Sequence, residues 1–145
     1  MNFILNFSIK DKNIKLFTFL VEYFENCKIR DFDKFNLVYN AWEVGILSIL
    51  VRMGANVNEG NVIGSSAINV ACFDGDVAMF DKLIELGAEI EYKDKYDWTP
   101  LHCACAYGNF NIVTKLIELR ANIHCKDIYG NNPLNLDCYK FRYCE

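Results

Sequence analysis

The sequence lacks the features that membrane, secreted and nucleic-acid-binding proteins need. Among its 145 residues no apolar run approaches the ~18–20 residues that span a bilayer, so we expect no membrane contact. A formal net charge of −4 does not fit the clustered basic surface that phosphate binding requires, which excludes a general nucleic-acid binder. No basic segment precedes Phe3-Ile4-Leu5 and no small-residue cleavage site follows it, so we expect no signal peptide and a cytoplasmic location.

Signals for catalysis and for cofactor binding are also missing. The chain has only two histidines, and it has no phosphate-binding loop and no paired-histidine metal motif. No serine or cysteine is placed by its spacing beside a base and an orienting group. Seven cysteines, an odd number in a chain that is 52% hydrophobic, fit reduced intracellular thiols better than a disulfide framework. We therefore expect one domain with its own core, no enzyme activity and no cofactor.

What the sequence does contain is an internal repeat with a period of 33 residues. Rare residue types recur at this interval: Pro100 and Pro133, Gly54 and Gly87, Gly75 and Gly108, and the series Cys72, Cys105 and Cys138. Recurrence of several rare residue types at one fixed interval is typical of repeat architectures, in which each unit buries its hydrophobic face against its neighbours.

The best-preserved copy predicts a pair of short helices. Thr99 can cap the first helix, and Pro100 fits its first position, where a missing N–H costs nothing. We expect this helix over 100–107, ended by Gly108, which adopts a left-handed conformation at low cost. A second helix is expected over 110–119, because its apolar residues follow helical spacing.

At these residues the sequence resembles the ankyrin-repeat family. Thr99-Pro100-Leu101-His102 matches the family's Thr-Pro-Leu-His signature, while Ser66-Ala67-Ile68-Asn69 and Asn132-Pro133-Leu134-Asn135 are weaker copies. The resemblance implies an all-α solenoid of stacked antiparallel helix pairs with projecting hairpin loops. It also implies a structural role for His102, which would tie the hairpin to its own helix, and similar bonds are open to Asn69 and Asn135.

The repeat register divides the chain, as one ankyrin-repeat domain, into five segments. Full repeats are expected at 61–93 and 94–126, and a degenerate one at 28–60, with Trp42 where the glycine between the helices belongs. Residues 1–27 read as an N-terminal capping region with a helix over 11–27, and 127–145 as a partial C-terminal capping repeat. Asp137, at a position held by Ala71 and Ala104 in earlier copies, favours an outward-facing last helix; the alternative is a chain cut from a longer array.

Among metals, zinc fits the available ligand types best, but we expect no zinc site. The candidate ligands are His102, Cys103, Cys105, His124 and Cys125. Zinc knuckles space two cysteines by two to four residues, whereas Cys103 and Cys105 have one residue between them. On a helix that offset points the two side chains to different faces. Cys105 also lies on the 33-residue series, at a small position that we expect to be buried.

The resemblance further implies that hairpin tips and inner helices form a concave face that binds partner proteins. Transferred to this sequence, the face comprises Ile63, Ser65, Phe73, Asp74, Lys95, Tyr96, Trp98, Tyr107, Tyr129 and Asn131, with Ala106 beside them. Aromatic side chains dominate interface energetics, which favours a protein-binding surface. The alternative is packing between neighbouring hairpins, and we expect about half of these residues to do that.

We therefore predict a noncatalytic protein–protein interaction module, an adaptor or scaffold that acts as a monomer. The alternative is a regulatory or inhibitory subunit whose face covers a partner enzyme's site. Abundant Asn, Ile, Lys, Phe and Tyr are typical of AT-rich genomes such as those of parasites, intracellular bacteria and large DNA viruses. In such a pathogen the partner would be a host protein and the location the host cell cytoplasm.

Two further features bear on partners and modification. Residues 61–93 have a net charge of −4, which could steer a basic partner surface or could belong to a solvated outer face. Ankyrin proteins as a family are hydroxylated at an asparagine before the hairpin, and Asn58 matches that register, although the leucine that usually precedes the target is only loosely matched. Asn58 is therefore a candidate hydroxylation site.

Overall fold

The computed structural model describes residues 15, 18–19, 22, 44–61 and 63–136. All regular structure within these residues is helical, which confirms the all-α prediction. The chain divides into two compact units, Met1–Val57 and Asn58–Glu145, which are described separately. The helix expected over 11–27 lies outside the described residues except for Lys15, Thr18, Phe19 and Glu22, which are helical. Trp42, Asp137 and Cys138 also lie outside them.

The first unit contributes one fully described helix, α4 (Val44–Arg52). Ile46, Leu47 and Leu50 on this helix are completely buried. Gly54 ends it with a φ of +85°, and its N–H donates to the carbonyl of Val51 at 2.8 Å. The position and apolar face of α4 are those expected of a second helix in the degenerate repeat.

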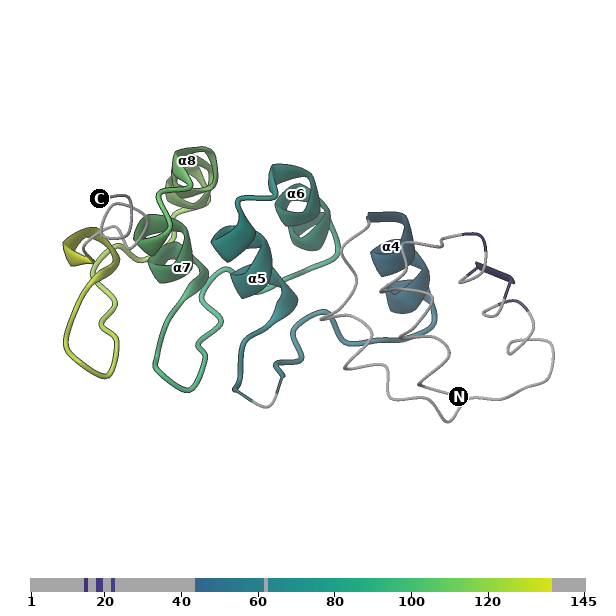
Figure 1. Ribbon diagram of the computed structural model, residues 1–145, viewed down its shortest axis with the longest axis horizontal. Helices are drawn as coiled ribbons and strands as arrows, with labels where there is room; N and C mark the ends of the chain where they lie inside the picture. The colour runs from purple at the N-terminus through teal and green to yellow at the C-terminus, as the bar shows by residue number, and fades with distance from the viewer. Residues whose placement is uncertain (1–14, 16–17, 20–21, 23–43, 62, 137–145) are drawn as a thin grey trace, which may run out of the picture. The chain divides into compact units, whose positions relative to one another are not determined.

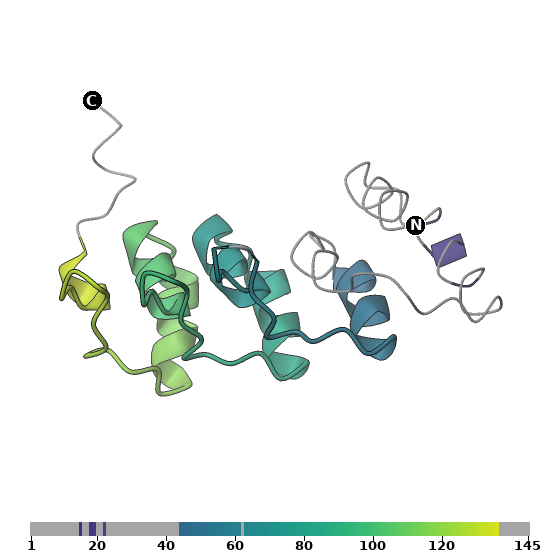
Figure 2. The ribbon, with the colours of Figure 1, turned by 90° about the horizontal axis from the view of Figure 1, so that it is seen from below.

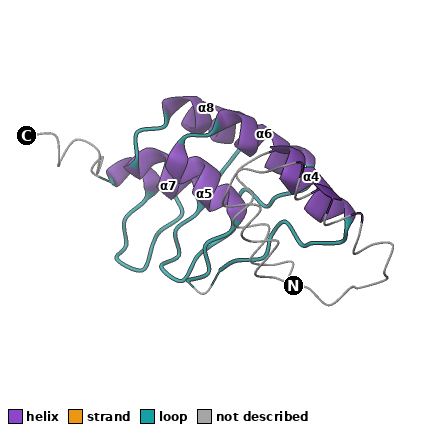
Figure 3. Cartoon of the chain, turned by 45° about the vertical axis from the view of Figure 1, so that its right-hand side comes forward, coloured by secondary structure: helices purple, strands orange, loops and turns teal. Residues whose placement is uncertain are grey.

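The second unit is built from repeated helix pairs. Its elements are α5 (Ala67–Asp74), α6 (Val77–Glu85), α7 (Pro100–Ala106), α8 (Phe110–Glu118) and the 3₁₀ turn η1 (Pro133–Asn135). The inner helices α5 and α7 pack side by side and η1 continues their row, while α6 and α8 form a second row behind them (Figures 1 and 2). The hairpin loops all project from the same edge of the rows (Figure 3). This is the stacked arrangement that the 33-residue period predicts.

The inner helices begin and end where local chemistry dictates. At the start of α7 the Thr99 hydroxyl and the His102 ring exchange hydrogen bonds with each other's backbone N–H, and Pro100 takes the first helical position. Helix α5 ends at Gly75, whose φ of +77° is costly for any residue with a Cβ. The helices expected over 100–107 and 110–119 each end one residue earlier in the structure, because Tyr107 and Leu119 are the C-terminal caps of α7 and α8.

The core of the second unit lies between the two rows of helices. Ile68 and Leu101 from the inner row and Leu83, Ile112 and Leu116 from the outer row are at most 1% exposed. Burying such a side chain contributes about 1.5–3 kcal/mol relative to leaving it in water. Helices of seven to nine residues are unstable alone, so this stacking must supply most of their stability.

The cysteines of the described residues are free thiols with different surroundings. Cys72 and Cys103 are buried, whereas Cys105 and Cys125 are half-buried. Cys105, 33 residues after the buried Cys72, was expected to be buried too; this was wrong, since Cys105 lines a pocket beside η1 and is half-buried. Burial raises the pKa of Cys72 well above its usual value and that of Cys103 to about 12. Both thiols therefore stay protonated, which is unfavourable for metal ligation or nucleophilic attack.

Candidate binding face

The hairpins that carry the candidate face are each locked by one Asn or Asp side chain. Asp94 Oδ1 accepts hydrogen bonds from the N–H groups of Tyr96 and Trp98 at 2.8 and 2.9 Å. Asn61 and Asp127 make the same pair of bonds, to the residues two and four positions further along. Sequence reasoning missed this role, although the three residues recur every 33 positions. The turns hold the residues at positions 63, 96 and 129 at the tips.

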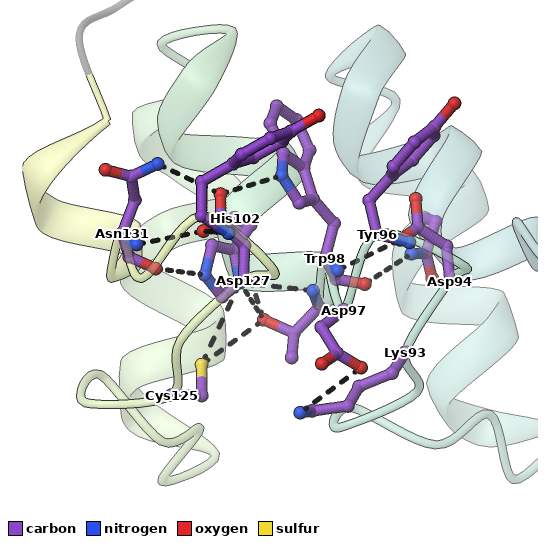
Figure 4. Close-up of polar contacts among 12 residues, drawn as sticks. Lys93, Asp94, Tyr96, Asp97, Trp98, His102, Cys125, Asp127 and Asn131 are labelled. Atoms are coloured by element: carbon purple, nitrogen blue, oxygen red, sulfur yellow. Dashed lines mark hydrogen bonds and ion pairs between the residues drawn. The ribbon is translucent and has the colours of Figure 1, made fainter.

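Neighbouring hairpins are also bonded to each other. The Lys95 N–H donates to the Ile63 carbonyl at 3.4 Å, and the Ile128 N–H donates to the Tyr96 carbonyl at 3.1 Å. The Trp98 indole N–H reaches Asp127 Oδ2 at 3.3 Å (Figure 4). Burial acts to raise the pKa of Asp127, but the hydrogen bonds it accepts from Asn131, Tyr129 and Trp98 outweigh burial and lower it.

His102 connects its own helix to the next hairpin. Its Nδ1 accepts from the Thr99 N–H at 3.1 Å, so Nε2 carries the proton and donates to the Asn131 carbonyl at 3.3 Å (Figure 4). Burial lowers the pKa of His102, which keeps the ring neutral. One repeat earlier, the Asn69 amide donates to the Trp98 carbonyl at 3.3 Å. The local bond expected for Asn69 is also present, since the Ser66 hydroxyl donates to Asn69 Oδ1 at 2.9 Å. Asn69 and His102 each bond to the next repeat as well, which the sequence did not predict.

A cysteine close to His102 does not form a nucleophile–base pair with it. Cys125 Sγ lies 3.8 Å from His102 Nδ1, but that nitrogen's lone pair already accepts the Thr99 N–H. The Cys125 thiol instead donates to the Asn122 carbonyl at 2.9 Å. No group of three or more His, Cys, Asp or Glu side chains within the described residues is arranged to hold a metal ion.

The residues assigned to the face differ in exposure. Ile63, Phe73, Tyr96 and Tyr129 are 40%, 45%, 40% and 74% exposed, and Asp74 and Lys95 are exposed beside them. The remaining members are half-buried: Ser65, Trp98, Tyr107 and Asn131. Ala106 is completely buried and was wrongly placed beside the face, since its side chain points into the core.

One aromatic pair and one cation–π contact lie within this set. The rings of Phe73 on α5 and Tyr107 at the end of α7 lie 4.0 Å apart between centroids, at 49°. Lys95 Nζ lies 4.9 Å from the centre of the Tyr96 ring, in cation–π geometry. The Phe73–Tyr107 contact joins two successive inner helices, so stacking creates a patch that neither repeat has alone.

Asn58, the candidate hydroxylation site, holds two repeats together. Its Oδ1 accepts from the Glu89 N–H at 2.8 Å, and its Nδ2 donates to the Gly87 carbonyl at 3.2 Å. One repeat later Glu91 accepts from the Asn122 N–H at 2.7 Å. Hydroxylation of Asn58 stays a prediction.

These features define a class: a helical-repeat protein whose hairpins and inner helices form a braced, partly apolar face. A model of ankyrin repeats in three copies matches residues 37–127, and the chain belongs to the ankyrin-repeat family. Ankyrin repeats are generally protein–protein interaction modules and typically noncatalytic. Comparison with curated proteins gives no match. Within the described residues, no helix has the length and apolar character needed to cross a bilayer.

Proposed function

We propose that this protein is an adaptor that binds a partner protein through its hairpin tips and inner helices. The binding face is defined by the side chains of Ile63, Phe73, Tyr96, Tyr107 and Tyr129, with Asp74 and Lys95 at its polar positions. The observation that carries the proposal is the exposure of three large apolar side chains on successive hairpins, Ile63, Tyr96 and Tyr129, and of a fourth, Phe73, on the inner helix α5. Exposed apolar groups gathered in this way are typical of interaction sites.

The bracing of the hairpins favours binding. Association is opposed by the entropy lost when loops and side chains become ordered. Here each hairpin is already fixed internally by Asn61, Asp94 or Asp127, and it is bonded to its neighbour through backbone groups. A partner would therefore meet a preorganised surface, and aromatic anchors on such surfaces contribute most of the binding free energy.

Charge favours a partner with a basic surface. Residues 58–136 contain eleven Asp and Glu against six Lys and Arg, a formal charge of −5. Asp74 follows Phe73 directly and is exposed, so a carboxylate stands at the edge of the aromatic patch. Negative potential around an apolar centre raises the association rate of positively charged partners, and the effect weakens with salt.

The test is affinity capture from cell lysate followed by mass spectrometry, with the captured protein then purified for direct binding. We expect the triple variant Phe73→Ala, Tyr96→Ala, Tyr129→Ala to lose capture while keeping the wild-type circular dichroism spectrum. Leu119→Ala removes a similarly exposed apolar side chain away from the face and should capture normally. Capture that survives in the triple variant, or that fails equally in the control, would contradict the proposal.

The same assay distinguishes an adaptor from an inhibitor. If the captured partner is an enzyme, its activity is measured with and without saturating amounts of this protein. An adaptor leaves the activity unchanged, whereas a subunit that covers the partner's active site lowers it. We further propose a reducing compartment for this function, because the free thiols of Cys105 and Cys125 are partly accessible to oxidants.

A further inference from the structure

Matching register positions of the outer helices α6 and α8 differ in exposure. On α6, Val77 and Ile84 are half-buried, Phe80 is 1% exposed, and Asp81 pairs with Lys115 of α8. The positions 33 residues later on α8 are Phe110, Val113, Thr114 and Ile117. Phe110 is 71% exposed and Ile117 is 48% exposed. In the described part of the chain, this side of α8 has no helix packed on it.

The last inner turn shows the same difference. Leu134 is 59% exposed, whereas its equivalents Leu101 and Ile68 are 1% and 0% exposed. Between η1 and α8 lies a pocket of about 170 Å³ whose lining includes Phe110, Val113, Leu134 and Leu136. These residues, together with Thr114 and Ile117, form what we call the end face. Figure 1 shows α8 as the last described helix of the outer row.

The end face has no charged residue where α6 has one. On α6, the two carboxylate oxygens of Asp81 accept hydrogen bonds from Lys115 Nζ at 2.8 and 3.0 Å. The equivalent position on α8 is Thr114, whose hydroxyl is already satisfied by donating to the Phe110 carbonyl at 2.9 Å. A further repeat of the α8 type would bring a lysine to this position without a carboxylate to meet it. An uncharged helix face can be buried here with no unpaired polar group.

The α8 residues of the end face form a stripe that can pack against the same stripe of a second copy. Residues 110, 113, 114 and 117 follow the i, i+3, i+4, i+7 spacing of one helix side. In an antiparallel pair of α8 helices about a two-fold axis between positions 113 and 114, Phe110 of each copy lies opposite Ile117 of the other. We propose that the end face is the contact surface for a second copy of this chain, which gives a two-fold symmetric dimer separate from the binding face. The sequence alone led us to expect a monomer.

The size of the end face sets the expected strength of the contact. A buried aromatic side chain contributes ~150–250 Å², and stable interfaces bury ~800 Å² on each partner. A patch centred on one phenylalanine and three aliphatic side chains is smaller than that, so the dimer should be reversible and depend on concentration. Its formation needs no disulfide and is measured with reductant present.

The experiment is analytical ultracentrifugation of the full chain over a wide concentration range. We expect the average mass to rise from 16.8 kDa toward twice that value as concentration increases. Ile117→Lys places a charge in the stripe and should keep the protein at 16.8 kDa at every concentration. Asn111→Lys adds the same charge at an exposed position of the same helix outside the stripe and should associate like the wild type.

Two outcomes would overturn the proposal: a wild-type chain that stays monomeric throughout, as it would if residues 137–145 covered the end face, or association that persists in Ile117→Lys. Circular dichroism checks that each variant folds. If Ile117→Lys does not fold, Phe110→Lys at the more exposed first residue of α8 takes its place with the same expected result. The triple variant of the binding face should still dimerise, which separates this proposal from the proposed function.

Discussion

Asn109, at the start of α8, caps the C-terminal end of α5 in the preceding repeat by donating a hydrogen bond to the carbonyl of Cys72. Its Nδ2 donates to the Cys72 carbonyl at 2.7 Å and to the Phe73 carbonyl at 2.9 Å. The equivalent residue on α6, Asp76, instead accepts from Met79 N–H and caps its own helix. An amide can donate a hydrogen bond, whereas a carboxylate cannot. At the same register position, Asp76 therefore caps its own helix, and Asn109 caps a helix of the preceding repeat.

Replacing Asn109 with alanine should therefore destabilise the stack. Two hydrogen bonds to helix-terminal carbonyls are lost, each with a net value of about 0.5–1.5 kcal/mol, so we expect the free energy of unfolding to fall by about 1–3 kcal/mol. Urea titration followed by circular dichroism measures this. Asn111→Ala, at an exposed position of the same helix, should change stability by less than about 0.5 kcal/mol. Equal effects of the two substitutions would show that the bonds to Cys72 and Phe73 are not important.

Gly75 and Gly87 allow the cost of a left-handed backbone to be separated from the cost of crowding. Both have positive φ, +77° and +86°. A Cβ on Gly75 would lie 2.6 Å from Asn109 Oδ1, whereas a Cβ on Gly87 has nothing within 4 Å. Gly87→Ala should cost about 1–2 kcal/mol, the price of the left-handed conformation alone.

Gly75→Ala should cost about 1–3 kcal/mol more than Gly87→Ala, because Asn109 must move and loses its bonds to α5. The excess should largely disappear when the comparison is repeated in an Asn109→Ala background, since the obstructing side chain is then gone. Thermal or urea unfolding of the six proteins, which are the wild type, the three single variants and the two double variants, gives the coupling energy directly. Additive effects of Gly75→Ala and Asn109→Ala would contradict the crowding argument.

Much of the fold follows from the sequence because glycine, proline and the capping residues act locally. Thr99, Pro100 and Gly108 lie where the sequence predicted them, so the ends of the one helix pair with predicted bounds, α7 and α8, were correct to within one residue. The direction of individual side chains was harder to predict. A 33-residue period gives the register of Ala106 and Cys105 but not the surroundings of each copy: Ala106 is buried where Phe73 is exposed, and Cys105 is half-buried where Cys72 is buried.

The hydrogen bonds between repeats were the other feature that the sequence could not predict. They join residues that are 29 to 37 positions apart, such as Asn69 with Trp98 and Asn109 with Cys72. Nothing local in the sequence marks them. The hairpin locks at Asn61, Asp94 and Asp127 could have been found from their period, but the residue type changes between copies. Which aromatic side chains stay exposed depends on these contacts, and so the candidate face needed the structure.

The Asp81–Lys115 ion pair should contribute little to stability. Its side chains are 48% and 38% exposed, and exposed ion pairs contribute about 0–1 kcal/mol. Asp81→Asn should therefore lower the free energy of unfolding by less than about 1 kcal/mol, and added salt should remove the difference. Urea titrations at low and high ionic strength test this. A larger effect that persists in salt would mean that the pair is needed to position α8 against α6.

His102 should make the stack sensitive to pH. Its folded pKa is lowered from 6.5 by burial, so the folded protein favours the neutral ring and the unfolded chain binds the proton more readily. The stability associated with the neutral ring is fully present above about pH 6.5 and is lost as the pH falls from there toward the lower folded pKa. Protonation would place a second proton on Nδ1, which accepts the Thr99 N–H.

His102→Asn should remove this dependence while keeping the fold, because Asn69 fills the same register and bonds to the next hairpin with an amide. We expect the free energy of unfolding of the wild type to fall between about pH 6.5 and pH 5, and that of His102→Asn to stay nearly level over the same range. Urea titrations across that interval provide the measurement. The exposed His124 supplies the control: His124→Asn should retain the wild-type pH slope. A slope that survives in His102→Asn would assign the pH sensitivity to another group.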